Sequence, residues 1–200
     1  MKNRKQEILQ ATLELAAEKG MGAVSMQQIA EKVGITKASL YNHFSSREEI
    51  VEAMYEYLRE ASKRKAGVGV VDYDHLTKEI PLKDILAGAV GTYRNMIRDP
   101  DLYLFYKIIM SERSVNRNAA EIMVKETETM IHATKTLFYA LQVKGIADFP
   151  DVDAAAFSFA MAVHAILDME FDLASSGAEK DTKRMQTFID EFSRIYQGGR

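Results

Sequence analysis

Apolar residues recur along this chain with the three- and four-residue spacing of amphipathic helices. The first such segment carries Ile8, Leu13 and Ala16 on one face, begins after Asn3 and ends at Lys19-Gly20. Comparable patterns predict further helices over 25–33, 37–44, 47–65, 82–98, 101–112, 119–143, 154–173 and 181–197. Polar or glycine-containing stretches separate these segments, and the whole pattern predicts an all-α protein of about nine helices.

Capping signals mark the helices between Ser25 and Arg47. Ser25 with Gln28 has the spacing of a capping box, and Gly34 follows an apolar helix where a left-handed residue ends it. Thr36 is placed to cap the next helix, and the small Ala30 permits two helices to cross closely. This spacing predicts a helix, a tight turn and a second helix, the arrangement that inserts a helix into the DNA major groove.

The predicted second helix turns Leu40 and Phe44 toward the core. After it, Ser46 and Glu49 have the spacing of another capping box, which opens a long helix over 47–65.

The segment GITKASLYNHFSSREEIV resembles the recognition-helix signature of the TetR family of transcriptional repressors. The resemblance covers about the first fifty residues. It implies a homodimer in which each subunit has a three-helix DNA-binding domain (1–46) and a larger helical domain (47–200) for a small-molecule inducer and dimer contacts.

Candidate DNA contacts follow from side-chain chemistry and from the resemblance. Lys37 suits guanine, Asn42 suits adenine and Ala38 suits a thymine methyl group. The resemblance implies phosphate contacts for Tyr41, His43 and Arg47. The full predicted set is Arg4, Ser25, Gln27, Thr36, Lys37, Ala38, Ser39, Tyr41, Asn42, His43 and Arg47. Arg4 is equally compatible with a solvated terminus, and Ser25 with capping alone.

Charge is distributed unevenly between the two predicted domains. The formal net charge is −3, yet residues 1–47 contain seven Lys or Arg against four Glu. The remainder contains 19 basic and 25 acidic residues. This asymmetry favours a basic DNA-binding domain joined to an acidic domain. The negative net charge of the chain is therefore compatible with the expected partner, double-stranded DNA with a palindromic operator.

Composition constrains the compartment and the chemistry. The chain has no cysteine, which fits a reducing cytoplasm and excludes a thiolate metal site. The longest segment without a charged residue, 154–167, is shorter than the roughly 20 residues of a membrane span. We therefore expect a cytoplasmic protein without a membrane segment.

The stretch 66–81 interrupts the helical pattern and is the expected domain junction. Asp72, Asp74 and His75 within it resemble metal ligands, but a solvated polar loop is the favoured interpretation. We expect no metal and no cofactor.

The segment 154–173 is apolar on opposite faces. One face would pack on the subunit core and the other on a second subunit. Together with 181–197 it predicts a four-helix dimer interface. A central helix of a monomer remains the alternative.

Methionine and aromatic residues of the larger domain supply lining for an apolar pocket that would hold a small, largely apolar effector. The predicted lining is Tyr93, Ile97, Phe105, Tyr106, Met110, Met123, Met130, Phe157, Met161, His164 and Asp168. Any of these residues is also compatible with ordinary core packing. His164 and Asp168, four residues apart, are expected to interact with each other or with a ligand.

These observations predict a ligand-responsive repressor. The alternative is a DNA-binding regulator without a small ligand, controlled by a protein partner. An all-helical enzyme is a remote alternative, because the chain has no HExxH motif, no glycine-rich phosphate loop and no cysteine nucleophile. The Glu128–His132 spacing is also one residue too long for the Glu-x-x-His of di-iron bundles. The operator, the effector, the sense of regulation and the number of dimers per operator do not follow from the sequence.

Overall fold

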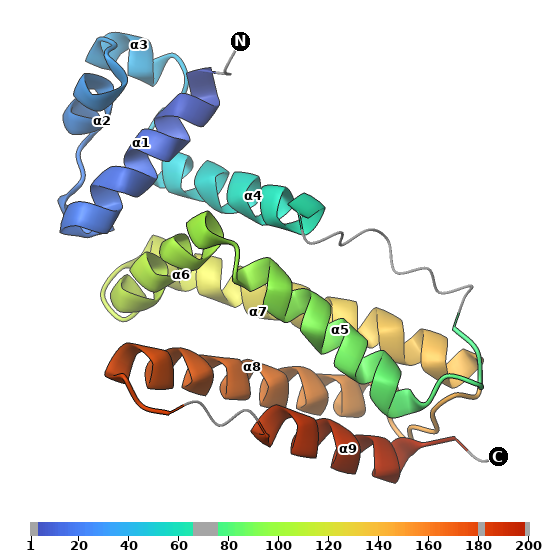
Figure 1. Ribbon diagram of the computed structural model, residues 1–200. Helices are drawn as coiled ribbons and strands as arrows, with labels where there is room; N and C mark the ends of the chain where they lie inside the picture. Colours follow the sequence, from blue (N-terminus) through green and yellow to red (C-terminus); the bar gives the residue numbers. More distant parts are fainter. Residues whose placement is uncertain (1–3, 66–75, 180–182, 199–200) are drawn as a thin grey trace. The chain divides into compact units, whose positions relative to one another are not determined.

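The computed structural model describes residues 4–65, 76–179 and 183–198, which are helical apart from connecting turns and an isolated β-bridge between Ala147 and Gln197. In these ranges the elements follow the chain in the order drawn in Figure 1. They are α1 (Arg4–Lys19), the short 3-10 helix η1 (Met21–Ala23), α2 (Met26–Val33), α3 (Lys37–Tyr41), α4 (Arg47–Lys65), α5 (Leu82–Ile97), α6 (Pro100–Glu112), α7 (Arg117–Val143), α8 (Val152–Ser176) and α9 (Arg184–Tyr196). The predicted all-α class is confirmed.

The chain forms two compact units. The first comprises Met1–Gly69 and Asn95–Lys125, and the second comprises Val70–Arg94 and Glu126–Arg200. The first unit thus joins the N-terminal helices to α6 and the start of α7. The domain boundary predicted after residue 46 is a functional division and stays a prediction.

In the first unit, α1 packs against α2, α4 and α6, and α2 packs against α3. Its core includes Ile8, Ile29, Leu40 and Ile50, all fully buried. Each of these residues lies on the apolar stripe of its helix, so the helical periodicity of the sequence directly explains this core.

The local signals of the helix-turn-helix are confirmed. The Ser25 hydroxyl accepts the Gln28 N–H at 3.3 Å, and the Gln28 side chain accepts the Ser25 N–H at 2.9 Å, a complete capping box. Gly34 ends α2 with φ 74°, a left-handed conformation that strains other residues. Thr36 caps α3 by accepting the Ser39 N–H at 3.1 Å.

Around the helix-turn-helix, two details differ from the sequence predictions. The predicted helix 37–44 ends at Tyr41, because His43 N–H bonds to Leu40 O three residues back and tightens the chain into a turn. The predicted Ser46–Glu49 capping box is only half formed. Ser46 accepts the Glu49 N–H, but the Glu49 carboxylate accepts from the N–H and hydroxyl of Ser45 instead of from Ser46.

In the second unit, aromatic rings from α7, α8, α9 and the connection between α7 and α8 form one cluster. Phe138 stacks on Phe149 with centroids 4.5 Å apart, and Phe159 meets Phe192 edge-on at 4.9 Å. Phe188 also contacts both Phe159 and Phe192. These contacts fix α8 and α9 side by side, as Figure 1 also draws them.

Helix α8 is buried on one side only. Ala156, Phe159 and Val163 lie in the core, whereas Phe157 is 52% exposed and Met169 46% exposed. The helix is also long and apolar enough to cross a membrane, the sole helix of the described ranges to meet that test. Core helices of soluble proteins meet the same test, and the buried side of α8 packs against α9 through the ring of Phe159.

Other helix ends follow the predicted chemistry. Asp99 caps α6 ahead of Pro100, Asp151 caps α8 through the Ala154 N–H at 2.9 Å, and Gly177 ends α8 with φ 72°. The predicted caps Asn3 and Asp181, and the Asp72-Asp74-His75 cluster, lie outside the described residues.

Candidate functional site

Helix α3 presents a continuous exposed surface. Lys37, Ala38 and Asn42 are exposed, and Tyr41 is 47% exposed although it is a large aromatic residue. On the opposite side, Leu40 is fully buried and Phe44 is 3% exposed. The buried pair thus holds the other four side chains outward, where a major groove can reach them.

Ser39 and His43 occupy the edges of that surface. Both are half-buried, so they are accessible from one side only. Both belong to the predicted DNA contacts, and the structure places them between the exposed face and the core.

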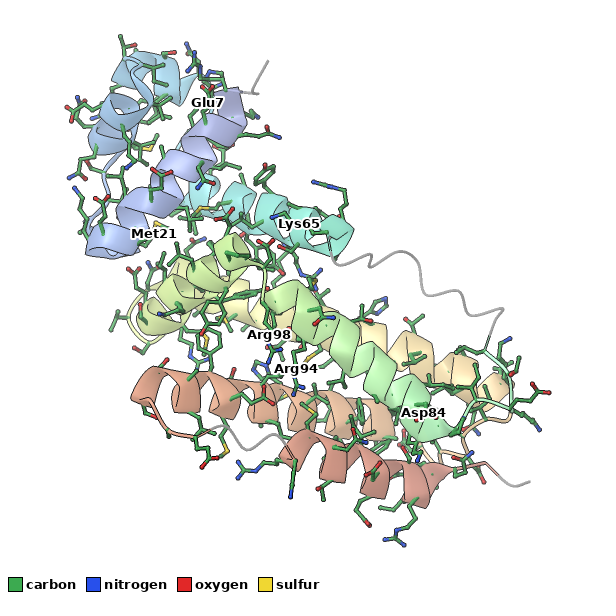
Figure 2. All side chains as sticks on the ribbon, viewed as in Figure 1. Glu7, Met21, Lys65, Asp84, Arg94 and Arg98 are labelled. Carbon is green, nitrogen blue, oxygen red and sulfur yellow. The ribbon has the colours of Figure 1, made fainter. Side chains whose placement is uncertain are left out.

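Polar side chains around α2 are engaged in local contacts. The Ser25 and Thr36 hydroxyls cap their helices, and Gln27 donates to the Glu31 carboxylate at 2.7 Å. Arg4, at the start of α1, donates to Glu7 at 2.6 Å with half of its side chain exposed. Figure 2 labels Glu7 near the beginning of this helix. A DNA contact from Gln27 or Arg4 would therefore replace or share an existing surface interaction.

Arg47 has a structural environment that sequence reasoning did not anticipate. Its Nη1 lies within hydrogen-bond distance of three carbonyl oxygens around η1, those of Met21, Gly22 and Val24, at 3.1–3.3 Å. Its Nη2 contacts Glu48 at 3.3 Å. The predicted phosphate contact stays a prediction, and the guanidinium already holds the α1–α2 connection to the start of α4.

A second contact holds the same connection from the other side. Glu112, at the end of α6, accepts the Gly22 N–H at 2.9 Å and the Asn116 side-chain amide at 3.1 Å. Figure 2 labels Met21, which precedes Gly22 in η1. We call the η1 residues with Arg47 and Glu112 the η1 clamp. No sequence pattern identifies it, because Glu112 lies 90 residues from Gly22.

The predicted pocket residues fall in both compact units. Ile97, Phe105, Tyr106, Met110 and Met123 belong to the first unit, and the other six belong to the second. In the first unit Phe105 is fully buried and its ring lies 6.3 Å from that of Tyr55 on α4. Phe105 is therefore a core residue that joins α6 to α4.

In the second unit the structure brings together three of the predicted residues. Met130 lies in a buried cluster with Ile131 and Ala160, and Tyr93 and Met161 pack against that cluster. Helices α5, α7 and α8 each contribute. The Tyr93 hydroxyl also donates to Glu126 at 3.0 Å, and the Glu126 side chain is buried.

The remaining three predicted residues lie along α8. His164 Nε2 and Asp168 Oδ2 are 3.8 Å apart, so the expected pair one turn apart is present as a long contact. Phe157 is half exposed. An open hollow of about 640 Å³ lies beside α1 in the first unit, lined by α1 with Lys32, Tyr57 and Asp101 among others, and contains none of the eleven predicted pocket residues.

Sequence comparison matches the N-terminal segment. The model of the bacterial regulatory proteins of the TetR family matches residues 8–54, which contain α2, the turn and α3. The HTH-type transcriptional regulator YerO of Bacillus subtilis is 28% identical over 137 residues, 60% of this chain and 46% of YerO. The nucleoid occlusion factor SlmA of Vibrio cholerae is 37% identical over 60 residues, 30% of this chain and 31% of SlmA. The matches therefore span less than half of these relatives.

Comparison of folds extends over nearly the whole chain. The flavonoid-responsive regulator FrrA superposes with a TM-score of 0.70 at 21% identity, covering 97% of each chain. GusR of Salmonella enterica superposes with a TM-score of 0.68 at 20% identity, covering 96% of this chain and 95% of GusR. Residues 8–54 therefore carry the DNA-binding segment of the TetR family of bacterial regulatory proteins, and the chain as a whole shares the fold of FrrA and GusR.

Proposed function

We propose that this protein is a cytoplasmic repressor that binds a palindromic operator as a homodimer and leaves it when a small, largely apolar effector binds. The observation that carries the proposal is the α3 surface, where Lys37, Ala38, Tyr41 and Asn42 are exposed above buried Leu40 and Phe44. A helix held in this way is suited to the major groove.

The side chains of α3 would have different roles, which follow from their chemistry. Lys37 and Asn42 carry donors that discriminate bases, and Ala38 is small enough to touch a thymine methyl. Tyr41 and the half-buried His43 would hold phosphates, which set affinity and register without reading sequence. Ser25 and Thr36, at helix N-termini, would add backbone N–H contacts to phosphate.

Dimerisation would use the exposed side of α8 together with α9. Phe157 and Met169 are large apolar residues exposed on α8, Ala165 between them is exposed as well, and Ile195 on α9 is 64% exposed. Apolar side chains gathered on two adjacent helices favour a two-fold four-helix interface. The two recognition helices would then enter successive major grooves about 34 Å apart.

The effector would bind in the second unit, beside Tyr93, Met130 and Met161. Support is the mixture of apolar and polar groups there, since Tyr93 packs against the cluster of Met130, Ile131 and Ala160 and also donates to the buried carboxylate of Glu126. FrrA, of the same fold, is a flavonoid-responsive regulator. To release DNA, the effector must bind more tightly to the non-binding conformation than to the binding one.

A regulator controlled by a protein partner remains the second candidate. SlmA, a nucleoid occlusion factor, shares the DNA-binding segment. The two candidates differ in a thermal-shift screen. Small apolar compounds that stabilise the protein and reduce operator binding support the ligand-responsive repressor, whereas a screen without such compounds favours the partner-controlled regulator.

The test of the main proposal uses DNA from upstream of the protein's own gene. A dimer should bind it in preference to a scrambled duplex, and compounds that stabilise the protein should release it. Equal, weak binding to both duplexes would contradict a sequence-reading domain.

A further inference from the structure

Two polar connections cross the interior of the second unit between α5 and its neighbours. Tyr93 donates to Glu126 on α7 at 3.0 Å, and Arg94 Nη2 donates to Glu170 on α8 at 2.5 Å. The side chains of Arg94 and Glu170 are only 25% and 21% exposed. Figure 2 shows Arg94 beside α8, with its side chain between α5 and that helix.

The guanidinium of Arg94 is incompletely satisfied. Its Nε is buried from solvent and makes no hydrogen bond in the described part of the chain, although Nη2 of the same group is paired. A buried donor without an acceptor is unfavourable, and such groups in native structures require an explanation such as a bound molecule. An incoming acceptor would remove this penalty, so the site favours a ligand that carries one.

The surroundings of Arg94 limit the charge of that ligand. Glu170 already neutralises the guanidinium. A ligand carboxylate would therefore be repelled by Glu170 and would have no unpaired positive charge to bind. A cationic ligand supplies donors instead of acceptors and leaves Nε unsatisfied. An uncharged acceptor avoids both penalties.

The apolar neighbours determine the rest of the ligand. Leu167 lies one turn before Glu170 on the same side of α8 and is 8% exposed. Tyr93, next to Arg94, packs against the cluster of Met130, Ile131 and Ala160. Methionine and aromatic side chains adapt to flat or irregular apolar shapes.

We propose that the effector is an uncharged apolar molecule bearing a carbonyl oxygen, which accepts the Nε–H of Arg94 while its apolar body lies beside Tyr93 and Leu167. This inference rests on the proposed ligand-responsive function and adds the chemical class of the ligand. It assigns Arg94 two roles, an ion pair with Glu170 through Nη2 and ligand recognition through Nε.

The test compares acetophenone with ethylbenzene, which has the same carbon skeleton without the carbonyl. Dissociation constants of both are measured by NMR titration on the full-length protein and on Arg94→Lys. Lysine retains a positive charge for Glu170 but lacks an Nε–H donor. The ratio of the two constants cancels the difference in hydrophobicity between the probes, so its change between proteins reports the carbonyl contact.

We expect Arg94→Lys to weaken acetophenone relative to ethylbenzene by about tenfold, as a buried hydrogen bond is lost. Arg117→Lys, a matched change at an exposed arginine paired with Glu121, should leave the ratio unchanged. In the wild type, the Arg94 Nε–H cross-peak, assigned by its loss in Arg94→Lys, should move with acetophenone and not with ethylbenzene. Benzoate should bind more weakly than acetophenone.

An unchanged ratio in Arg94→Lys, or tighter binding of benzoate, would overturn the inference while leaving an apolar effector possible. Failure of the wild type to bind acetophenone would also overturn it. Operator binding measured on the same preparations separates these outcomes from failure of the proposed repressor. Arg117→Lys should bind the operator like the wild type, and a protein that binds no operator at all would contradict the proposed function instead.

Discussion

At the scale of single residues, side-chain exposure separates the two kinds of predicted DNA contact. Lys37 and Tyr41 are exposed on α3 and depend little on the fold for their conformation. Arg47 is held by carbonyl oxygens of the α1–α2 connection. Substitutions at the first two should alter DNA binding with little change in stability, and substitution of Arg47 should alter stability.

Tyr41→Phe removes one hydroxyl from the exposed face of α3. We expect about fivefold weaker binding to operator and scrambled duplex alike, because one phosphate hydrogen bond contributes about 1 kcal/mol. Fluorescence anisotropy on both duplexes measures this. Tyr139→Phe, on a similarly exposed tyrosine of α7, serves as the matched control and should bind like wild type. A loss confined to the operator would assign Tyr41 to base recognition.

Lys37→Ala should relax sequence preference at one position of each half-site. Loss of a base contact typically removes about 1–3 kcal/mol of discrimination at the contacted pair. Binding to a set of operators with single base-pair changes measures the effect position by position. Equal weakening across the whole set would identify Lys37 as a phosphate contact.

At the scale of elements, the η1 clamp joins α1, α2, α4 and α6. Arg47→Lys should destabilise the protein by about 1–2 kcal/mol, since lysine cannot reproduce the contacts of the planar guanidinium with several carbonyl oxygens. Urea denaturation measures the difference. Arg4→Lys, at an exposed arginine paired with Glu7, should change stability by less than about 0.5 kcal/mol. An equal effect of both substitutions on stability would show that the η1 clamp contributes no specific stabilisation.

Asp99 links the start of α6 to the end of α4. It caps α6 through the Leu102 N–H and pairs with Lys65 at 2.6 Å. Burial raises the pKa of Asp99, but the hydrogen bond from Lys65 and the Leu102 N–H outweigh it and hold the pKa below its usual value. Because the pKa is lower in the folded state, the stabilisation is present above the unfolded pKa of about 3.9 and is lost as the pH falls through the folded value.

Asp99→Asn tests this linkage, since asparagine caps helices well but carries no charge. We expect a deficit of up to about 1 kcal/mol at pH 6, limited by the exposure of Lys65, that disappears as the pH falls through the lowered pKa of Asp99 in the folded state. Urea midpoints between pH 2.5 and 7 measure it. A deficit that stays constant over this range would exclude the charge as its cause.

The exposed side of α8 makes a specific prediction about assembly. Ala165→Glu should yield monomers, because a carboxylate would be buried at the proposed interface. Ala160, on the same helix, lies in the subunit core at 1% exposed, so a glutamate there would instead disrupt folding. Sedimentation measures the mass, with Ala17→Glu on an exposed position of α1 as control. An Ala165→Glu dimer of unchanged stability would place the interface elsewhere.

The sequence predicts those elements whose signals are local. The capping box of Ser25, the left-handed Gly34 and the cap at Thr36 each depend on neighbours within a few residues. The clamp and the Arg94–Glu170 pair join residues 90 and 76 positions apart, and their pairing depends on how helices pack. Likewise, periodicity identified two apolar faces on α8 but did not indicate which one the subunit core covers.

At the scale of the whole molecule, we propose that a basic N-terminal segment on an acidic chain binds DNA and recognises its sequence. Residues 1–47 carry seven basic and four acidic residues although the chain as a whole has a net charge of −3. Attraction between such a segment and phosphates weakens with salt, because neutralised phosphates release counterions that added salt replaces.

The most direct test is a titration of the protein with the upstream duplex and with a scrambled duplex, over a series of salt concentrations. We expect a dimer to bind, more tightly to the upstream duplex, with an affinity that falls by more than about a hundredfold between 0.05 and 0.2 M salt. Equal affinity for both duplexes, or an affinity independent of salt, would contradict this proposal.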